Sequence, residues 1–165
     1  MISGLLYLED YITEDTSSEI LEWIGPPKTK IIKRYRNRIL RYGSNKPYPQ
    51  KETPPEIPEL FRPIQERLFN ENIMPEIPNS VTINEYHPGQ TITPHIDSRS
   101  SGPIIAILSL LGIMSLTLSR KEQRETIVLA PKSLLVLSGE SRTDWMHHTE
   151  PARNLRYSIV FRCGR

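Results

Sequence analysis

Residues 103–118 read PIIAILSLLGIMSLTL, the longest apolar run in the chain, and this run indicates the fold class. A membrane-spanning helix needs about 18 or more consecutive apolar residues, whereas Ser109, Gly112 and Ser115 interrupt this shorter run. Its aliphatic, β-branched composition on both sides of a glycine instead predicts two buried strands that join near Gly112.

Further short segments rich in Ile, Val, Leu and Thr surround this run. Turn signals such as His87-Pro88-Gly89 and Ser138-Gly139 separate them. Several short strands at this spacing predict a sandwich or barrel with helices packed outside. The expected strands cover residues 81–83, 104–110, 113–118, 126–130, 133–137 and 155–161.

Two helices are predicted before the strand-rich part. Residues 16–19 (TSSE) have the form of a capping box, and Gly25-Pro26-Pro27 ends the apolar stripe that follows them. The second helix is expected from Pro58 to Asn70, with Pro63 in its first turns, where proline costs least.

The composition is that of one globular domain. The chain has 165 residues, of which 37% are hydrophobic and 24% charged, and its formal net charge is +2. A single cysteine, Cys163, excludes an internal disulfide and suits a reducing compartment, so we expect a cytoplasmic protein. No targeting segment or membrane span is evident, and we expect a monomer.

One segment has a strongly biased charge. Residues 28–46 contain eight basic residues and no acidic one, with tyrosines interleaved. Cations can neutralise phosphates while aromatic rings stack on unpaired bases, so this composition suits nucleic acid. A solvated, charged strand or hairpin is the alternative. The candidate contacts are Arg34, Tyr35, Arg36, Arg38, Arg41 and Tyr42.

The motif His95-Ile96-Asp97 is the first candidate for chemistry. On a strand, residues i and i+2 point to the same face, so both side chains can reach one metal ion. Two histidines and one carboxylate are the ligands of non-haem Fe(II) oxygenases, which keep open positions for substrate and oxygen. The third ligand must then come from the remaining histidines, which are His87, His147 and His148.

A second candidate lies near the end of the chain, where Arg156, Ser158, Val160 and Arg162 share one predicted strand face. Buried arginines are costly unless anions pair with them, and these two could approach opposite ends of a small dicarboxylate. Two surface arginines on an edge strand are the alternative. Earlier in the chain, Asn84 and Tyr86 place an amide and a phenol on one face, where they could hydrogen-bond the oxygens of a bound acid.

The order of these motifs resembles the AlkB family of Fe(II)- and 2-oxoglutarate-dependent dioxygenases, over residues 80–162. The stretches NEYHPGQ (84–90), PHIDS (94–98) and GESR (139–142) are most similar to the branch that includes the tRNA wobble-uridine hydroxylases. Residues 38–43, which include Tyr42-Gly43, are loosely similar to the segment that forms a nucleotide-recognition lid in this family.

The resemblance implies a mainly β chain whose residues 80–165 form a double-stranded β-helix, or jelly roll. Residues 1–79 would be an N-terminal helical and basic extension with a possible lid, all within one domain. His95, Asp97 and His147 would ligate Fe(II), with His147 preferred because Trp145-Met146-His147 matches the family's aromatic-x-His pattern. The residues expected to hold the co-substrate 2-oxoglutarate are Asn84, Tyr86, Arg156 and Arg162.

The implied activity uses O2 and 2-oxoglutarate to oxidise an alkylated or modified base in DNA or RNA, most simply by demethylation. Arg99 stands where the bacterial repair enzyme has an acidic residue that contacts the base, so a cationic methylated base is disfavoured here. Two other functions compete with this one. They are the same chemistry on a protein side chain, and a catalytically silent β-barrel that binds nucleic acid.

Overall fold

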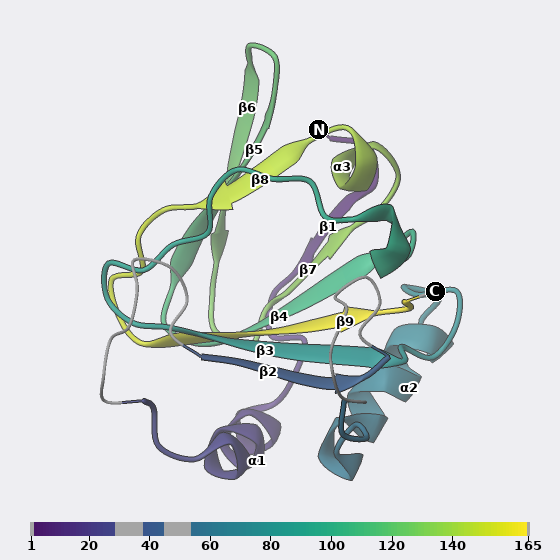
Figure 1. Cartoon of the computed structure of the whole chain (residues 1–165), viewed down its shortest axis with the longest axis vertical. Helices are drawn as coiled ribbons and strands as arrows, with labels where there is room; N and C mark the ends of the chain where they lie inside the picture. Colours follow the sequence, from purple (N-terminus) through teal and green to yellow (C-terminus); the bar gives the residue numbers. More distant parts are fainter. Residues whose placement is uncertain (1, 29–37, 45–53, 165) are drawn as a thin grey trace.

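Two facing β-sheets with helices on one side make up the computed structural model (Figure 1), which describes residues 2–28, 38–44 and 54–164. The larger sheet has the strand order β1-β7-β4-β9-β3-β2, and the smaller has the order β6-β5-β8. This arrangement confirms the predicted mainly β, jelly-roll fold. The strands are β1 (Leu5–Leu8), β2 (Arg38–Gly43), β3 (Ser80–Tyr86), β4 (Ile105–Leu111), β5 (Met114–Arg120), β6 (Gln123–Leu129), β7 (Leu134–Leu137), β8 (Met146–Thr149) and β9 (Arg156–Arg162).

In the part of the chain that the structure describes, five helical segments accompany the strands. They are α1 (Glu14–Ile24), η1 (Glu59–Phe61), α2 (Arg62–Asn70), η2 (Arg99–Ser101) and α3 (Gly139–Thr143). The first helix begins before the predicted capping box, because Thr13 is its N-cap and accepts a hydrogen bond from the Thr16 backbone N–H at 3.2 Å. The second helix confirms the expectation for residues 58–70, with a short 3₁₀ turn ahead of α2.

Antiparallel pairing of β3 with β9 gives the larger sheet two different faces. Val81 and Ile83 pack with Ile159 and Phe161 in the main apolar core. The residues that alternate with them face the other way and line a cavity between the two sheets, as the predicted period of two requires. The members of this second set are Thr82, Asn84, Tyr86, Arg156, Ser158, Val160 and Arg162.

Helices α1 and α2 cover the face of the larger sheet that turns away from the smaller one (Figure 1). Phe61 has no exposed surface, and its ring packs edge-on against Trp23 at 5.6 Å and against Phe161 at 6.3 Å between ring centroids. The rings of Trp23, Phe61 and Phe161 therefore join α1 and η1 to β9.

Residues from the N-terminal half complete the larger sheet. Strand β1 pairs with β7, and β2 pairs with β3 at the sheet edge. Residues 38–43, which are loosely similar to a recognition lid, form an edge strand of this sheet, and their role as a lid stays a prediction. None of the helices in the described ranges has the length and apolarity needed to span a bilayer.

Replacing Phe61 tests the packing between the helices and the sheet. We expect Phe61→Ala to lower the free energy of unfolding by about 3–5 kcal/mol, since it leaves a cavity between the Trp23 and Phe161 rings. Phe69→Ala is the matched control, because Phe69 is 42% exposed on the neighbouring α2 and its loss should cost under about 0.5 kcal/mol. Urea denaturation followed by fluorescence measures both, and equal losses would contradict this account of the core.

Candidate active site

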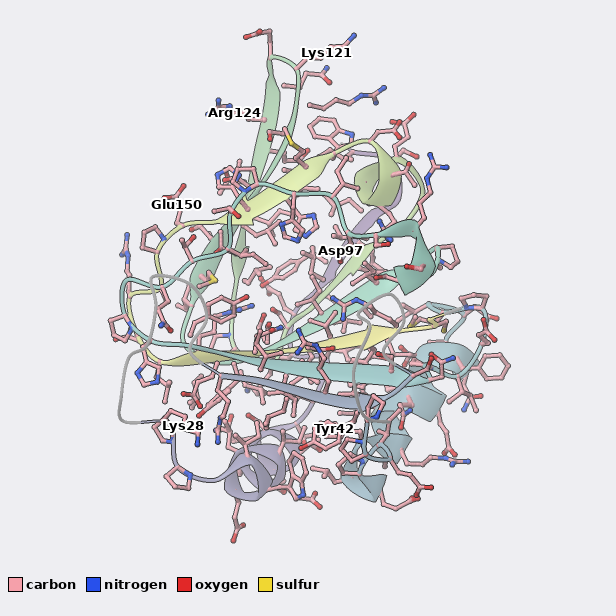
Figure 2. All side chains as sticks on the ribbon, in the orientation of Figure 1. Lys28, Tyr42, Asp97, Lys121, Arg124 and Glu150 are labelled. Atoms are coloured by element: carbon pink, nitrogen blue, oxygen red, sulfur yellow. The ribbon has the colours of Figure 1, made fainter. Side chains whose placement is uncertain are left out.

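The cavity between the sheets gathers most of the residues to which the sequence assigns chemistry. Its empty space is about 690 Å³ when the open mouth is included. Asp97 lies between the two sheets in Figure 2. One wall is apolar and the rest is polar or charged. The lining residues are Arg41, Thr82, Asn84, Tyr86, Ile92, His95, Asp97, Ile107, Leu116, Leu129, His147, Thr149, Arg156, Ser158, Val160 and Arg162.

His95, Asp97 and His147 converge at one end of this cavity. One potential ligand atom from each lies within 4.8 Å of the others, and Nε2 of His95 is 3.2 Å from a carboxylate oxygen of Asp97. At metal–ligand distances of about 2.1 Å, adjacent ligands of an octahedral ion lie about 3 Å apart. The donor types and their spacing therefore fit a divalent transition metal.

The protonation states of this group also suit a metal. Burial alone would raise the pKa of Asp97, but the hydrogen bond with His95 and the charge of Arg162 hold that pKa below its usual range. Burial lowers the pKa of His147 to about 4 despite the opposing effect of Asp97. At neutral pH the carboxylate is therefore ionised and the His147 imidazole neutral, which are the forms that bind metals.

The structure corrects the local conformation expected for His95 and Asp97. His95 forms only an isolated β-bridge with His147, through backbone hydrogen bonds of 3.1 and 2.8 Å, and Asp97 lies outside any strand. Pro94 directly precedes His95 and has no N–H to continue a ladder. The side chains nevertheless converge, because Nδ1 of His95 donates to the Thr93 carbonyl at 2.8 Å and this turns Nε2 toward Asp97.

Arg156 lies deep in the cavity, at the end of β9 nearest Tyr86. Its side chain is among the largest fully buried ones, and its guanidinium donates to the Ser109 hydroxyl at 2.9 Å. Within the described residues its Nε has no hydrogen-bond partner, while its guanidinium carbon lies 5.5 Å from the centre of the Tyr86 ring. Burial lowers the pKa of Arg156 to about 10, so the group remains a cation that suits an anionic ligand.

Arg162 lies at the other end of the same strand face, close to the metal-binding group. Its guanidinium donates to the Thr82 hydroxyl at 3.2 Å and lies 3.7 Å from the Asp97 carboxylate. Between the two arginines, the Asn84 amide donates to the Ser158 hydroxyl at 3.2 Å. The cavity floor thus has a cation at each end and neutral hydrogen-bonding groups between them.

The candidate nucleic-acid contacts have different positions. Arg34, Tyr35 and Arg36 lie outside the described residues. Arg41 lines the cavity, and Arg99 is exposed at the start of η2, two residues beyond Asp97.

Arg38 and Tyr42 lie on the face of β2 opposite Arg41, so these three candidate contacts do not share one surface. Arg38 pairs at 2.8 Å with Glu85, which is buried and also contacts His87 and Tyr157. Tyr42 packs on Trp23, with 5.7 Å between ring centroids, and lies on the helical side of the sheet in Figure 2. Alternation along β2 causes this separation, since only every second residue faces the cavity.

Three site residues have no role in the sequence predictions. Ser109 and Thr82 each accept a hydrogen bond from a cavity arginine, and Arg142 donates to the backbone carbonyls of Asp97 and Ser98. Ser109 interrupts a buried apolar run, and this was an available signal, because a buried hydroxyl needs a partner. Arg142 belongs to the GESR stretch (139–142) that carries part of the family resemblance, but its role could not be predicted because its partners lie more than 40 residues earlier in the chain.

Comparisons with known proteins agree with this geometry. Residues 6–162 match the 2OG-Fe(II) oxygenase superfamily. The chain is 30% identical over 162 residues to the tRNA (carboxymethyluridine(34)-5-O)-methyltransferase alkbh8 of Xenopus tropicalis, a match that covers 91% of this chain and 26% of that protein. The chain thus spans about a quarter of the length of this curated relative.

Two solved structures share the fold. The structure of OsALKBH1 matches with a TM-score of 0.74 and 16% identity, over 98% of this chain and 99% of that one. A prolyl-4-hydroxylase from Pseudomonas putida matches with a TM-score of 0.66 and 13% identity, over 98% and 93% of the two chains. The chain therefore belongs to the 2OG-Fe(II) oxygenase superfamily, whose cofactors are Fe(II), 2-oxoglutarate and O2, and it is AlkB-like, as the order of its motifs predicts.

Proposed function

We propose that this chain is a dioxygenase that oxidises a modified base in nucleic acid, and that His95, Asp97 and His147 hold its Fe(II). The convergence of two imidazoles and one ionised carboxylate at the end of the cavity is the observation that carries the proposal. These three side chains would supply the protein's ligands to the ion, and the co-substrate and oxygen would use the positions that they leave open.

Arg156 and Arg162 are proposed to hold 2-oxoglutarate between them. The buried Arg156 guanidinium would pair with the carboxylate remote from the metal, with the Tyr86 hydroxyl assisting. Arg162 and Asn84 would bind the end of the co-substrate that lies close to Asp97. This arrangement selects a dicarboxylate, because an acid with one carboxylate would leave a buried cation without an anion.

When bound, Fe(II) supplies the oxidation of a substrate C–H bond by O2, coupled to the decarboxylation of 2-oxoglutarate to succinate and CO2. The chain itself fixes the co-substrate and excludes water. The apolar wall formed by Ile107, Leu116 and Leu129 keeps the reacting groups in a low-dielectric space, which strengthens the arginine–carboxylate pairs. At neutral pH the Asp97 carboxyl is ionised and the His147 imidazole is neutral with one nitrogen lone pair available, so neither one has to lose a proton before metal binds.

The charge of the open part of the cavity supports a neutral or anionic modified base. Arg41 lines the cavity from β2, and Arg99 lies near its metal-binding end. Among the described residues that line the cavity, Asp97 is the single acidic one, and it is assigned to the metal. Cations here would repel a base that carries a positive N-methyl group, and they would attract phosphates or an anionic substituent. The Xenopus relative is named for carboxymethyluridine in tRNA, a nucleoside whose carboxymethyl group is an anionic substituent of this kind.

The adjacent histidines His147 and His148 provide a test of the metal assignment. They point to opposite faces of β8, and only His147 lines the cavity. We expect His147→Ala to weaken Co(II) binding at least about 100-fold, while His148→Ala binds within about twofold of the parent. Titration of the apo protein followed by Co(II) absorption measures both. If His148→Ala lost Co(II) affinity and His147→Ala kept it, the third metal ligand would be His148 and not His147.

Replacement of the deep arginine tests the co-substrate assignment. Arg156→Met should raise the 2-oxoglutarate concentration for half-maximal turnover at least about 30-fold, since losing one member of a buried charged pair costs about 2–5 kcal/mol. Arg153→Met is the control, because Arg153 is exposed just before β9. An unchanged 2-oxoglutarate requirement in Arg156→Met would exclude the clamp, and unchanged Co(II) affinity would show that the metal site is intact.

Succinate release tests the substrate class. We expect release with Fe(II), O2 and 2-oxoglutarate to rise with RNA oligonucleotides that contain carboxymethyl-type uridines, and to rise less with 1-methyladenine. Arg41→Gln should reduce this stimulation about tenfold, whereas Arg124→Gln, on the hairpin away from Asp97 (Figure 2), should not. Stimulation by peptides alone would favour a protein substrate. Binding of RNA without any succinate release from iron-loaded protein would favour a silent binding protein.

A further inference from the structure

The three proposed metal ligands are held in place by different means. His147 belongs to β8, and His95 is fixed to it by a reciprocal pair of backbone hydrogen bonds. Asp97 follows in an irregular segment, beyond the last of these backbone pairs. The direction of its carboxylate therefore depends on what fixes residues 97 and 98.

Arg142 reaches this segment from α3. Its Nη1 donates to the Asp97 carbonyl at 2.8 Å, and its Nη2 donates to the Ser98 carbonyl at 2.5 Å. Two bonds from one planar guanidinium to successive carbonyls fix both the position and the orientation of the peptide between them. The side chain of Arg142 is buried, with 4% of the residue exposed, so solvent does not compete strongly for these bonds.

Both hydrogen bonds of the Arg142 guanidinium end on backbone carbonyls of the ligand segment, so its action is on the backbone of that segment. Burial lowers the pKa of the Arg142 guanidinium, which means that holding this cation inside the protein has a free-energy cost. A role in geometry is consistent with both observations.

The helix that carries Arg142 is itself fixed from behind. Ser138 and Ser141 form a capping box, and the Gly4 carbonyl accepts hydrogen bonds from both hydroxyls at 2.9 and 3.0 Å and from the Ser138 N–H at 2.9 Å. Gly4 has a φ of +79°, and a Cβ on it would lie 2.0 Å from the Ser138 carbonyl oxygen. Close packing of this N-terminal residue against Ser138 therefore gives α3 a defined position.

We propose that Arg142 is a positioning residue for the metal centre, which directs the Asp97 carboxylate toward His95 and His147 by holding the carbonyls of residues 97 and 98. The proposal rests on the metal ligands assigned under the proposed function. Without the guanidinium fork, Asp97 can take several orientations, and metal binding must then fix one of them at a cost in affinity.

Metal affinity of the apo protein, measured without 2-oxoglutarate or nucleic acid, tests this role. We expect Arg142→Met to weaken Co(II) binding about 10–100-fold. Arg142→Lys should weaken it by a similar factor although the charge is kept, because one ammonium group cannot hold two carbonyls in a fixed orientation. Co(II) absorption intensity should change as well, since the carboxylate no longer occupies one position.

Arg120→Gln is the matched control. Arg120 forms exposed ion pairs with Glu140 and Asp144, one within α3 and one just after it, at 3.4 and 3.7 Å, and it does not contact residues 97 and 98 through these pairs. Its loss should leave Co(II) affinity within about twofold of the parent. This control separates an effect of Arg142 on the ligand segment from a general loosening of α3.

Thermal unfolding shows whether each Arg142 variant folds, and Co(II) binding by His147→Ala shows whether the assigned metal ligands are correct. Co(II) affinity within twofold of the parent in folded Arg142→Lys would overturn the positioning role, even if its melting temperature fell. If Arg142→Met does not fold, the lysine variant carries the test. If His147→Ala also binds Co(II) normally, the assigned metal ligands are wrong, and that result concerns the proposed function and not Arg142 alone.

Discussion

The register between β3 and β9 is the constraint on which the rest of the molecule depends. It places Asn84 opposite Ser158 and Tyr86 opposite Arg156, so that both strands turn the same alternate residues toward the cavity. The residues between them build the apolar core under the helices. A shift by one residue would exchange the two faces and place Arg156 and Arg162 in that apolar core, at a large free-energy cost. Folding stability and the arrangement of the site are therefore set by the same pairing.

Features that repeat along the chain could be predicted from the sequence. The alternation from Arg156 to Arg162 shows which side chains share a face, and the break at Gly112 separates two buried strands. The spacing of His95 and Asp97 also predicted that their side chains lie together, as they do in the structure. The local backbone differs from the predicted strand, because His95 forms an isolated β-bridge and Asp97 lies outside any strand. Local periodicity is informative here because alternate residues of β3 and β9 face the apolar core and the cavity.

Features that depend on distant partners could not be predicted in the same way. Strands β1 and β8 have only four residues each, too few to show a period, and each is defined by a strand from another part of the chain. Alternation along β2 separates Arg38 from Arg41, but the pairing with β3 decides which of the two faces the cavity. In that pairing Arg38 lies opposite Glu85, which is 47 residues later in the sequence. A single sequence shows which residues can share a face, but it does not show which element lies opposite them.

The strand order of the larger sheet also has a consequence for the time course of folding. Strand β9 lies between β4 and β3, and β1 is hydrogen-bonded to β7, so the sheet is built from pairings between residues far apart in the sequence. Sheets of this kind fold slowly, because long loops must close before their contacts form. The centre of this sheet cannot close before residues 156–162 have been synthesised. Until then the apolar surfaces of β3 and β4 have no partner between them, which makes the nascent chain a candidate for chaperone binding during translation.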